Sequence, residues 1–124
     1  MLIFLLFTMA GTVHNAYWVT IFGITSVGGN MFINGIILGV SEMLSALTSG
    51  FLISITSSTV AFEILAMVGL TCNTVLTYIL NDGGIAAYIV LFIALQGIGG
   101  VYTCLFVIIG EKIPVTQVGA VFTA

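Results

Sequence analysis

Long uncharged runs separated by short polar breaks dominate this chain. One such run, residues 85–110, contains no Asp, Glu, Lys or Arg. A helix rises about 1.5 Å per residue, so this run is long enough to cross a bilayer core of about 30 Å. The pattern predicts four such spans, with the opening of a fifth at the end of the chain: residues 2–25, 32–55, 60–80, 85–110 and, in part, 115–124. We therefore expect an all-α membrane protein, with one helical region over residues 1–124.

The breaks between the spans predict the direction of each helix. Glycine and Asx residues predict turns at residues 25–30 and 81–84, and residues 56–59 form a very short connection. Pro114 disfavours the α conformation at the residue before it, so the fourth helix should stop there. Helices joined by short loops alternate in direction, which puts residues 56–59 and 111–114 on the same side as the N-terminus. Lys112 predicts that this side is cytoplasmic.

The N-terminal residues allow a second interpretation. Residues 1–11 (MLIFLLFTMAG) have the apolar core of a signal peptide but no positive charge before it. Apolar character resumes at Ala16, which favours a spanning helix over a cleaved signal. Either interpretation places the protein in a membrane, of the cell surface or of an organelle such as the mitochondrion, and the four spans predict a multi-pass protein.

Composition excludes several classes of function. The chain is 60% hydrophobic and 4% charged, too few charges to cover a soluble domain. One basic side chain excludes electrostatic binding of nucleic acid. Cys72 and Cys104 lie in apolar runs, which favours two small buried thiols over a metal pair. With no nucleophile and base pair, metal set or phosphate loop, we expect no enzyme activity, no metal and no cofactor.

Small and polar residues mark one face of the second span. They follow helical spacing and comprise Gly35, Gly39, Glu42, Ala46 and Ser49. Gly35 and Gly39 form a GxxxG pair, which predicts close packing of another helix. Glu42 lies near the middle of the span, where an ionised acid costs roughly 3 kcal/mol. It should act as a proton or cation site, or as an acid hydrogen-bonded between helices; the absence of a basic partner in the chain favours the first.

Polar and aromatic residues also interrupt the first and fourth spans. His14, Tyr17 and Trp18 lie close together in the first, where they could line a cavity or, for the aromatic pair, anchor at the membrane interface. Tyr102 and Thr103 share a region of the fourth, where Tyr102 offers a ring and a hydroxyl to a cavity or packs against neighbours. In the third span, Glu63 lies near the helix start and is interpreted as interfacial, and Asn73 as a helix-packing residue.

Two stretches resemble a known family. The run GGNMFINGIILGVSEMLSAL (residues 28–47) and the run GIGGVYTCLFVIIGEKIPVTQVGA (residues 97–120) are similar to the organic cation and anion transporter branch of the major facilitator superfamily. They resemble the junction of its seventh and eighth helices, and its tenth helix with the following A-E-x-x-P-T-x-x-R motif. The matching residues are Gly29, Asn30, Phe32, Asn34, Gly39, Val40, Glu42, Gly97, Ile98, Tyr102, Glu111 and Pro114, with Tyr17 matching a family aromatic.

The resemblance implies helices seven to ten of the C-terminal half of that fold. It implies that five side chains face a solute pathway, namely Tyr17, Trp18, Glu42, Tyr102 and Thr103, and that Glu111 and Pro114 form a gating elbow. The family's basic loop after helix eight is replaced by residues 55–59, and its arginine after the proline by Gln117. We therefore expect a fragment or degenerate member of a secondary transporter of organic ions or other small solutes, working by alternating access. The alternative is a transporter-derived structural subunit without transport activity. Both need the lipid bilayer and further helices or subunits as partners.

Overall fold

Four helices make up the part of the chain that the structure describes. The computed structural model describes residues 2–23, 30–79 and 84–113. These residues form α1 (Leu2–Gly23), α2 (Met31–Ile55), α3 (Ser58–Ile79) and α4 (Ile85–Lys112). The predicted all-helical class is confirmed, and each predicted span corresponds to one helix with similar bounds. The predicted partial fifth helix, residues 115–124, and Pro114 lie outside the described residues.

Three of the four helices are long and apolar enough to cross a membrane. These are α2, α3 and α4, and together they indicate a multi-pass integral membrane protein in contact with the lipid bilayer. The first predicted span forms α1 as a helix, but α1 is not among these three. Its crossing of a membrane therefore stays a prediction.

Local capping groups explain where the helices begin and end. Asn30 begins α2 because its side chain accepts a hydrogen bond from the Phe32 N–H at 2.8 Å. The Ser57 hydroxyl accepts from the Val60 N–H at 3.4 Å, so α3 begins at Ser58, two residues before the predicted start at residue 60. Ile113 has the extended angles φ −104° and ψ 132° at the end of α4. The predicted stop before the proline is thus confirmed.

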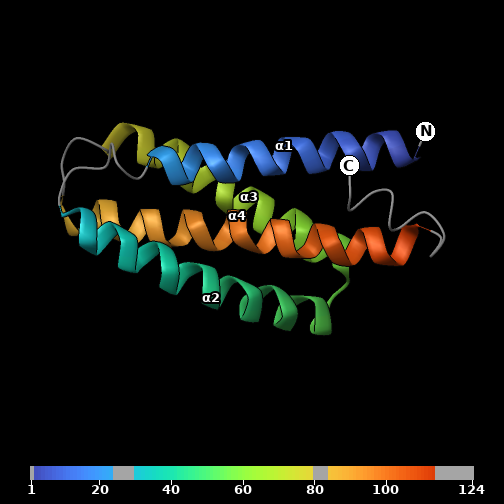
Figure 1. Cartoon of the computed structure of the whole chain (residues 1–124). Coiled ribbons are helices and arrows are strands. Elements are labelled where there is room, and N and C mark those ends of the chain that lie inside the picture. Colours follow the sequence, from blue (N-terminus) through green and yellow to red (C-terminus); the bar gives the residue numbers. More distant parts are fainter. Residues whose placement is uncertain (1, 24–29, 80–83, 114–124) are drawn as a thin grey trace.

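Helix α4 is the hub of the bundle. It packs against α1, α2 and α3, and it contains most of the buried apolar side chains. Figure 1 shows α1 and α2 on opposite sides of α4, with α3 crossing behind. The α2 to α3 connection, the C-terminal end of α4 and the N-terminus lie at one end of the bundle, as predicted (Figure 1). Because the other helices depend on α4, its surface decides how closely each one approaches.

Helices α3 and α4 meet along a glycine seam, which we define as Gly69, Gly97 and Gly100 with Leu65. A Cβ atom built on Gly97 would lie 2.5 Å from the Gly69 backbone nitrogen and 2.6 Å from its Cα. At Gly100 the added atom would lie 2.8 Å from Leu65 Cδ1. Two helix backbones can come this close only where side chains are absent. The seam continues into a cluster that includes the fully buried Cys104, a free thiol as predicted, while the free thiol of Cys72 is partly exposed.

Helix α2 meets α4 through small hydroxyl side chains. The buried residues of α2 are all polar: Asn34, Ser41, Ser45 and Ser49. Its large apolar side chains, such as Met43, Leu47 and Phe51, are exposed, as lipid contact requires. Ser45 and Ser49 donate to carbonyl oxygens of their own helix at 2.8 and 3.1 Å, so burial leaves neither hydroxyl hydrogen unpaired.

This packing corrects the predicted small-residue face of α2. Of its five members, only Ser49 is buried. Gly35 and Gly39, predicted to pack against another helix, are exposed, and a Cβ on either would meet no described atom within 4 Å. Serines occupy the buried positions because a hydroxyl side chain is small enough for a close helix contact, and those of Ser45 and Ser49 bond to their own backbone. Within the described chain, the close glycine contact is Gly69 with Gly97; packing of Gly35 and Gly39 on a helix of another chain stays a prediction.

Candidate functional site

A cleft opens where α1, α2 and α4 face one another. Each helix contributes residues at positions i, i+3 and i+4, which lie on one helical face. The cleft has a volume of about 230 Å³. Its lining residues are His14, Tyr17 and Trp18 from α1, Glu42, Ser45 and Ala46 from α2, and Gly99, Tyr102 and Thr103 from α4. All five residues predicted to face a solute pathway line this one cleft, although their distance in sequence is as large as 86 positions (103 − 17).

Aromatic rings form one wall of the cleft. Tyr17 and Tyr102 stack with ring centroids 5.8 Å apart and an interplanar angle of 21°. His14 lies 6.2 Å from the Tyr102 ring, and Trp18 meets Tyr17 edge to face at 5.8 Å. Such pairs typically contribute about 0.5–1.5 kcal/mol each beyond the area they bury. The rings therefore attach α1 to α4 and leave π faces beside the cleft.

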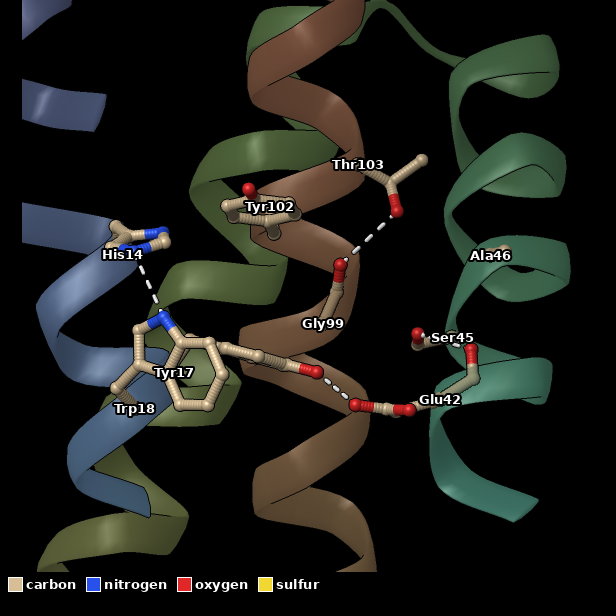
Figure 2. Close-up of a pocket in the computed structure, with 9 residues that line it drawn as sticks. All are labelled: His14, Tyr17, Trp18, Glu42, Ser45, Ala46, Gly99, Tyr102 and Thr103. Carbon is tan, nitrogen blue, oxygen red and sulfur yellow. Dashed lines mark hydrogen bonds between the residues drawn. The ribbon is translucent and has the colours of Figure 1, made fainter. Parts of the chain in front are cut away.

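One hydrogen bond spans the cleft between α1 and α2. The Tyr17 hydroxyl donates to Glu42 Oε1. Figure 2 shows the phenol and the carboxylate pointing toward each other, just below Gly99 of α4 in this view. Beside this bond, Gly99 lets the Ser45 side chain of α2 lie against α4, because a Cβ on Gly99 would lie 2.6 Å from the Ser45 hydroxyl oxygen. The bond ties together two helices that otherwise have few contacts.

The other side-chain donors of the cleft mostly bond within their own helices. Trp18 Nε1 donates to His14 Nε2 at 2.8 Å, so the neutral imidazole carries its hydrogen on Nδ1. The Ser45 hydroxyl donates to the Glu42 carbonyl oxygen at 2.8 Å, and the Thr103 hydroxyl to the Gly99 carbonyl oxygen at 3.1 Å. Glu42 itself is exposed, and in its ionised form its side chain offers acceptors and no donor. The cleft therefore presents acceptors and aromatic faces to any solute.

Several lining residues were not predicted as site residues. Ser45 and Ala46 follow Glu42 by three and four positions, and Gly99 precedes Thr103 by four. Helical spacing from the predicted residues could have found all three. For His14 the sequence allowed a place in a cavity lining, and the structure places it there, bonded to Trp18. The sequence does not give the relative rotation of the three helices, and this rotation determines which of their faces meet.

The predicted gating elbow lies at the end of the bundle, away from the cleft. Glu111 is exposed in the last turn of α4, and its Oε2 accepts a hydrogen bond of 2.6 Å from the buried hydroxyl of Ser58. Ser58 is the first residue of α3, so the carboxylate also lies near the positive end of that helix dipole. Glu111 thus connects the end of α4 to the start of α3. A gating role stays a prediction, and Pro114 lies outside the described residues.

A second hollow, between α1, α3 and α4, has a different character. Its volume is about 500 Å³, and among its described lining residues none is charged. Asn73, predicted to make a contact between helices, lines it and instead donates to the Gly69 carbonyl oxygen of its own helix at 2.9 Å. No group of three or more His, Cys, Asp or Glu in the described ranges could hold a metal ion. The chemistry of the molecule is therefore concentrated at the cleft with Glu42.

Comparisons with known proteins add no relative to this picture. No family model, no curated protein and no solved structure matches the chain. The resemblance to the major facilitator superfamily accordingly stays an inference from the residues quoted above, and function has to be argued from the cleft.

Proposed function

We propose that this chain provides part of the solute pathway of a secondary membrane carrier of small organic ions, of the major facilitator type that its sequence resembles. The observation that carries the proposal is the cleft itself: Tyr17, Trp18, Glu42, Tyr102 and Thr103, from three helices, line one cavity. Carriers of this type bind solutes between helices near the middle of the membrane. For this role α1 must also cross the membrane, with its aromatic face at the depth of Glu42.

The chemistry of the cleft favours cations among the organic ions. Its charged side chain is a carboxylate, and ring faces of tyrosine and tryptophan attract cations. Most donors are already bonded to protein acceptors, which leaves little to stabilise an anion. A bound cation would also offset the cost of an ionised Glu42 in an apolar bundle. The proposed solute is therefore a small organic cation with an apolar or aromatic part.

The cleft is partly open, so the described helices alone do not enclose a solute. In an alternating-access carrier, helices of the other half cover the cleft in turn from either side. The proposed carrier therefore includes further helices, from the same protein or from partner subunits.

Uptake by proteoliposomes tests this function. Vesicles containing the protein should accumulate a small organic cation above the level of empty vesicles, and Glu42→Gln should abolish most of this uptake, because the amide carries no charge. Glu63→Gln is the matched control, since Glu63 is an exposed acid of α3 that does not line the cleft. Uptake that is absent for the wild type, or equal in wild type and Glu42→Gln, would contradict the carrier proposal.

A second candidate is a structural subunit of a larger membrane complex, without transport. The exposed Gly35 and Gly39 of α2 favour it, because a GxxxG pair without a neighbour in the described chain suits a helix of another subunit. Gly39→Leu should then reduce assembly, measured by size-exclusion chromatography in detergent. If Gly39→Leu leaves the assembly intact while the wild type transports a cation, this candidate is wrong.

A further inference from the structure

The cleft's hydrogen bonds narrow the class of cation that it accepts, an inference that rests on the proposed function. In the described structure, the carboxylate of Glu42 has the Tyr17 hydroxyl as its side-chain donor. The hydroxyls of Ser45 and Thr103 donate to backbone carbonyls, and the Trp18 N–H donates to His14. A cation that binds Oε1 at the position of the Tyr17 hydroxyl displaces that donor, and no neighbouring hydroxyl of the described cleft is placed to replace it.

We propose that the cleft selects protonated amines that carry an N–H group over quaternary ammonium ions, because the N–H replaces the Tyr17 hydroxyl on Glu42. An N–H of the amine restores a charge-assisted bond to the carboxylate, while its carbon part rests on the rings of Tyr17 and Tyr102. A quaternary ion has charge and ring contacts but no hydrogen to donate. Its binding leaves the carboxylate without a donor, which is the costly outcome in a cleft partly shielded from water.

The dimensions of the cleft limit the amine to a small one. A volume of about 230 Å³ is below the roughly 300–1,000 Å³ of sites for drug-sized molecules. A single ring with a one-carbon or two-carbon amine arm fits that limit, with the ring beside the stacked pair of Tyr17 and Tyr102 at 5.8 Å. Tyr17 therefore has two roles: its ring contributes to the wall, and its hydroxyl is the donor that a bound cation replaces on Glu42.

Binding of two nearly isosteric probes tests the exchange. Protonated N,N-dimethylbenzylamine has one N–H, and benzyltrimethylammonium replaces that hydrogen by a methyl group. The protein is placed in lipid nanodiscs, and fluorescence of Trp18, the single tryptophan of the chain, reports binding. We expect the tertiary amine to bind at least about tenfold more tightly than the quaternary ion, the size of one charge-assisted hydrogen bond.

Two tyrosine variants test the hydrogen-bond exchange. Tyr17→Phe keeps the ring and removes the hydroxyl, so neither probe has a bond to Glu42 to displace, and both probes should bind several-fold more tightly than they bind to the wild type, with their ratio kept. Tyr102→Phe removes the other tyrosine hydroxyl of the cleft and should leave both affinities unchanged. Circular dichroism checks that both variants are folded.

Each outcome has a defined meaning. Equal affinities of the wild type for the two probes overturn the proposal, whether or not Tyr17→Phe folds. Affinities for both probes that are unchanged or weaker in Tyr17→Phe also overturn it, because the Tyr17 hydroxyl is then not displaced by a bound cation, while cation binding itself survives. If the wild type binds neither probe, or if Glu42→Gln binds both as well as the wild type does, the proposed cation site fails and this inference fails with it.

Discussion

The glycine seam and the cleft are built on opposite sides of the same helix and differ in how they use small residues. At the seam, Gly97 of α4 brings α3 so close that even a methyl group would collide with the Gly69 backbone. At the cleft, Gly99 of α4 lies against the Ser45 side chain of α2, and Tyr17 and Glu42 form their hydrogen bond beside that contact. A glycine in a membrane helix can therefore pack against the backbone of a neighbouring helix or against a small polar side chain, and the residues of the facing helix decide which.

The comparison also separates stability from function. The seam is backbone packed against backbone, with clusters of buried apolar side chains at its sides. The cleft is held by ring contacts and one bond across exposed residues. We therefore expect substitutions at the seam to change the free energy of unfolding strongly, and substitutions at the cleft to change ligand binding more than stability.

The largest effect is expected for Gly97→Ala. The added Cβ would lie 2.5 Å from the Gly69 nitrogen, and backbone atoms on both helices cannot yield without separating α3 from α4. Overpacking of this kind should cost about 3 kcal/mol of unfolding free energy. Denaturant titration in detergent micelles, followed by circular dichroism, measures the loss.

Gly35→Ala is the matched control for the seam. Gly35 is also a helix glycine, but its added Cβ meets no described atom within 4 Å, so its stability should change by less than about 0.5 kcal/mol. Gly69→Ala should fall between the two, because its Cβ would lie 3.2 Å from the Ile98 nitrogen. If Gly97→Ala is no worse than Gly35→Ala, the contrast between seam and exposed face is wrong.

The sequence predicted the helices better than the contacts between them. Runs without charge locate all four helices, and Pro114 predicts the extended Ile113, since both are local effects. The sequence did not locate the glycines of the tightest contact: Gly35 and Gly39 form the GxxxG motif, but within the described chain Gly69 and Gly97 have the close neighbours. A motif on one helix carries no information on which face of a second helix meets it.

The cleft shows the same limit in another form. Tyr17, Glu42 and Tyr102 were predicted as pathway residues partly by resemblance and partly because polar groups avoid lipid, and the structure places them in one cavity. The Tyr17 to Glu42 bond was not predicted. For Glu42 the sequence left two interpretations, a proton or cation site and an acid hydrogen-bonded between helices. The bond to Tyr17 agrees with the second interpretation, and the position of Glu42 in the cleft keeps the first one open. Such a pairing depends on helix rotation, which periodicity does not give.

The next largest effect concerns the contact of α2 with α4. Gln96 Nε2 donates to the Ser41 carbonyl oxygen across the two helices at 2.8 Å. Gln96→Met keeps the length of the side chain and removes the donor, so unfolding free energy should fall by about 1.5 kcal/mol. Thr74→Val is the control, because the exposed Thr74 hydroxyl bonds only to Leu70 of its own helix in the described structure. Equal stability of the two variants would mean that the buried serines of α2 hold this helix against α4 without the bond from Gln96.

A smaller effect is expected where α3 begins. Ser58→Ala removes the 2.6 Å bond to Glu111 and should cost about 1 kcal/mol in the same titration. Ser54→Ala, which removes an exposed hydroxyl bonded to Phe51 of its own helix, should cost much less. Glu111→Gln keeps an acceptor oxygen and should cost less than Ser58→Ala. A loss larger for Glu111→Gln would show that the charge at the start of α3, and not the bond, connects the two helices.

The smallest effect on stability should come from Trp18→Phe, which removes the bond to His14 inside one helix. Because both residues lie on α1 and are exposed, unfolding free energy should change by less than about 0.5 kcal/mol.

The substitution should instead change the tautomer of the His14 imidazole. His14 is the single histidine of the chain, so its ring nitrogens give resolved ¹⁵N signals in a magnetic resonance spectrum. In the wild type the Trp18 N–H holds the neutral ring as the Nδ1–H tautomer, and in Trp18→Phe both tautomers should be populated. Tyr102→Phe keeps Trp18 and should keep the single tautomer. A wild-type ring that already samples both tautomers would mean that the wall of the cleft is looser than its hydrogen bonds indicate, and the contrast with the rigid glycine seam would then be greater still.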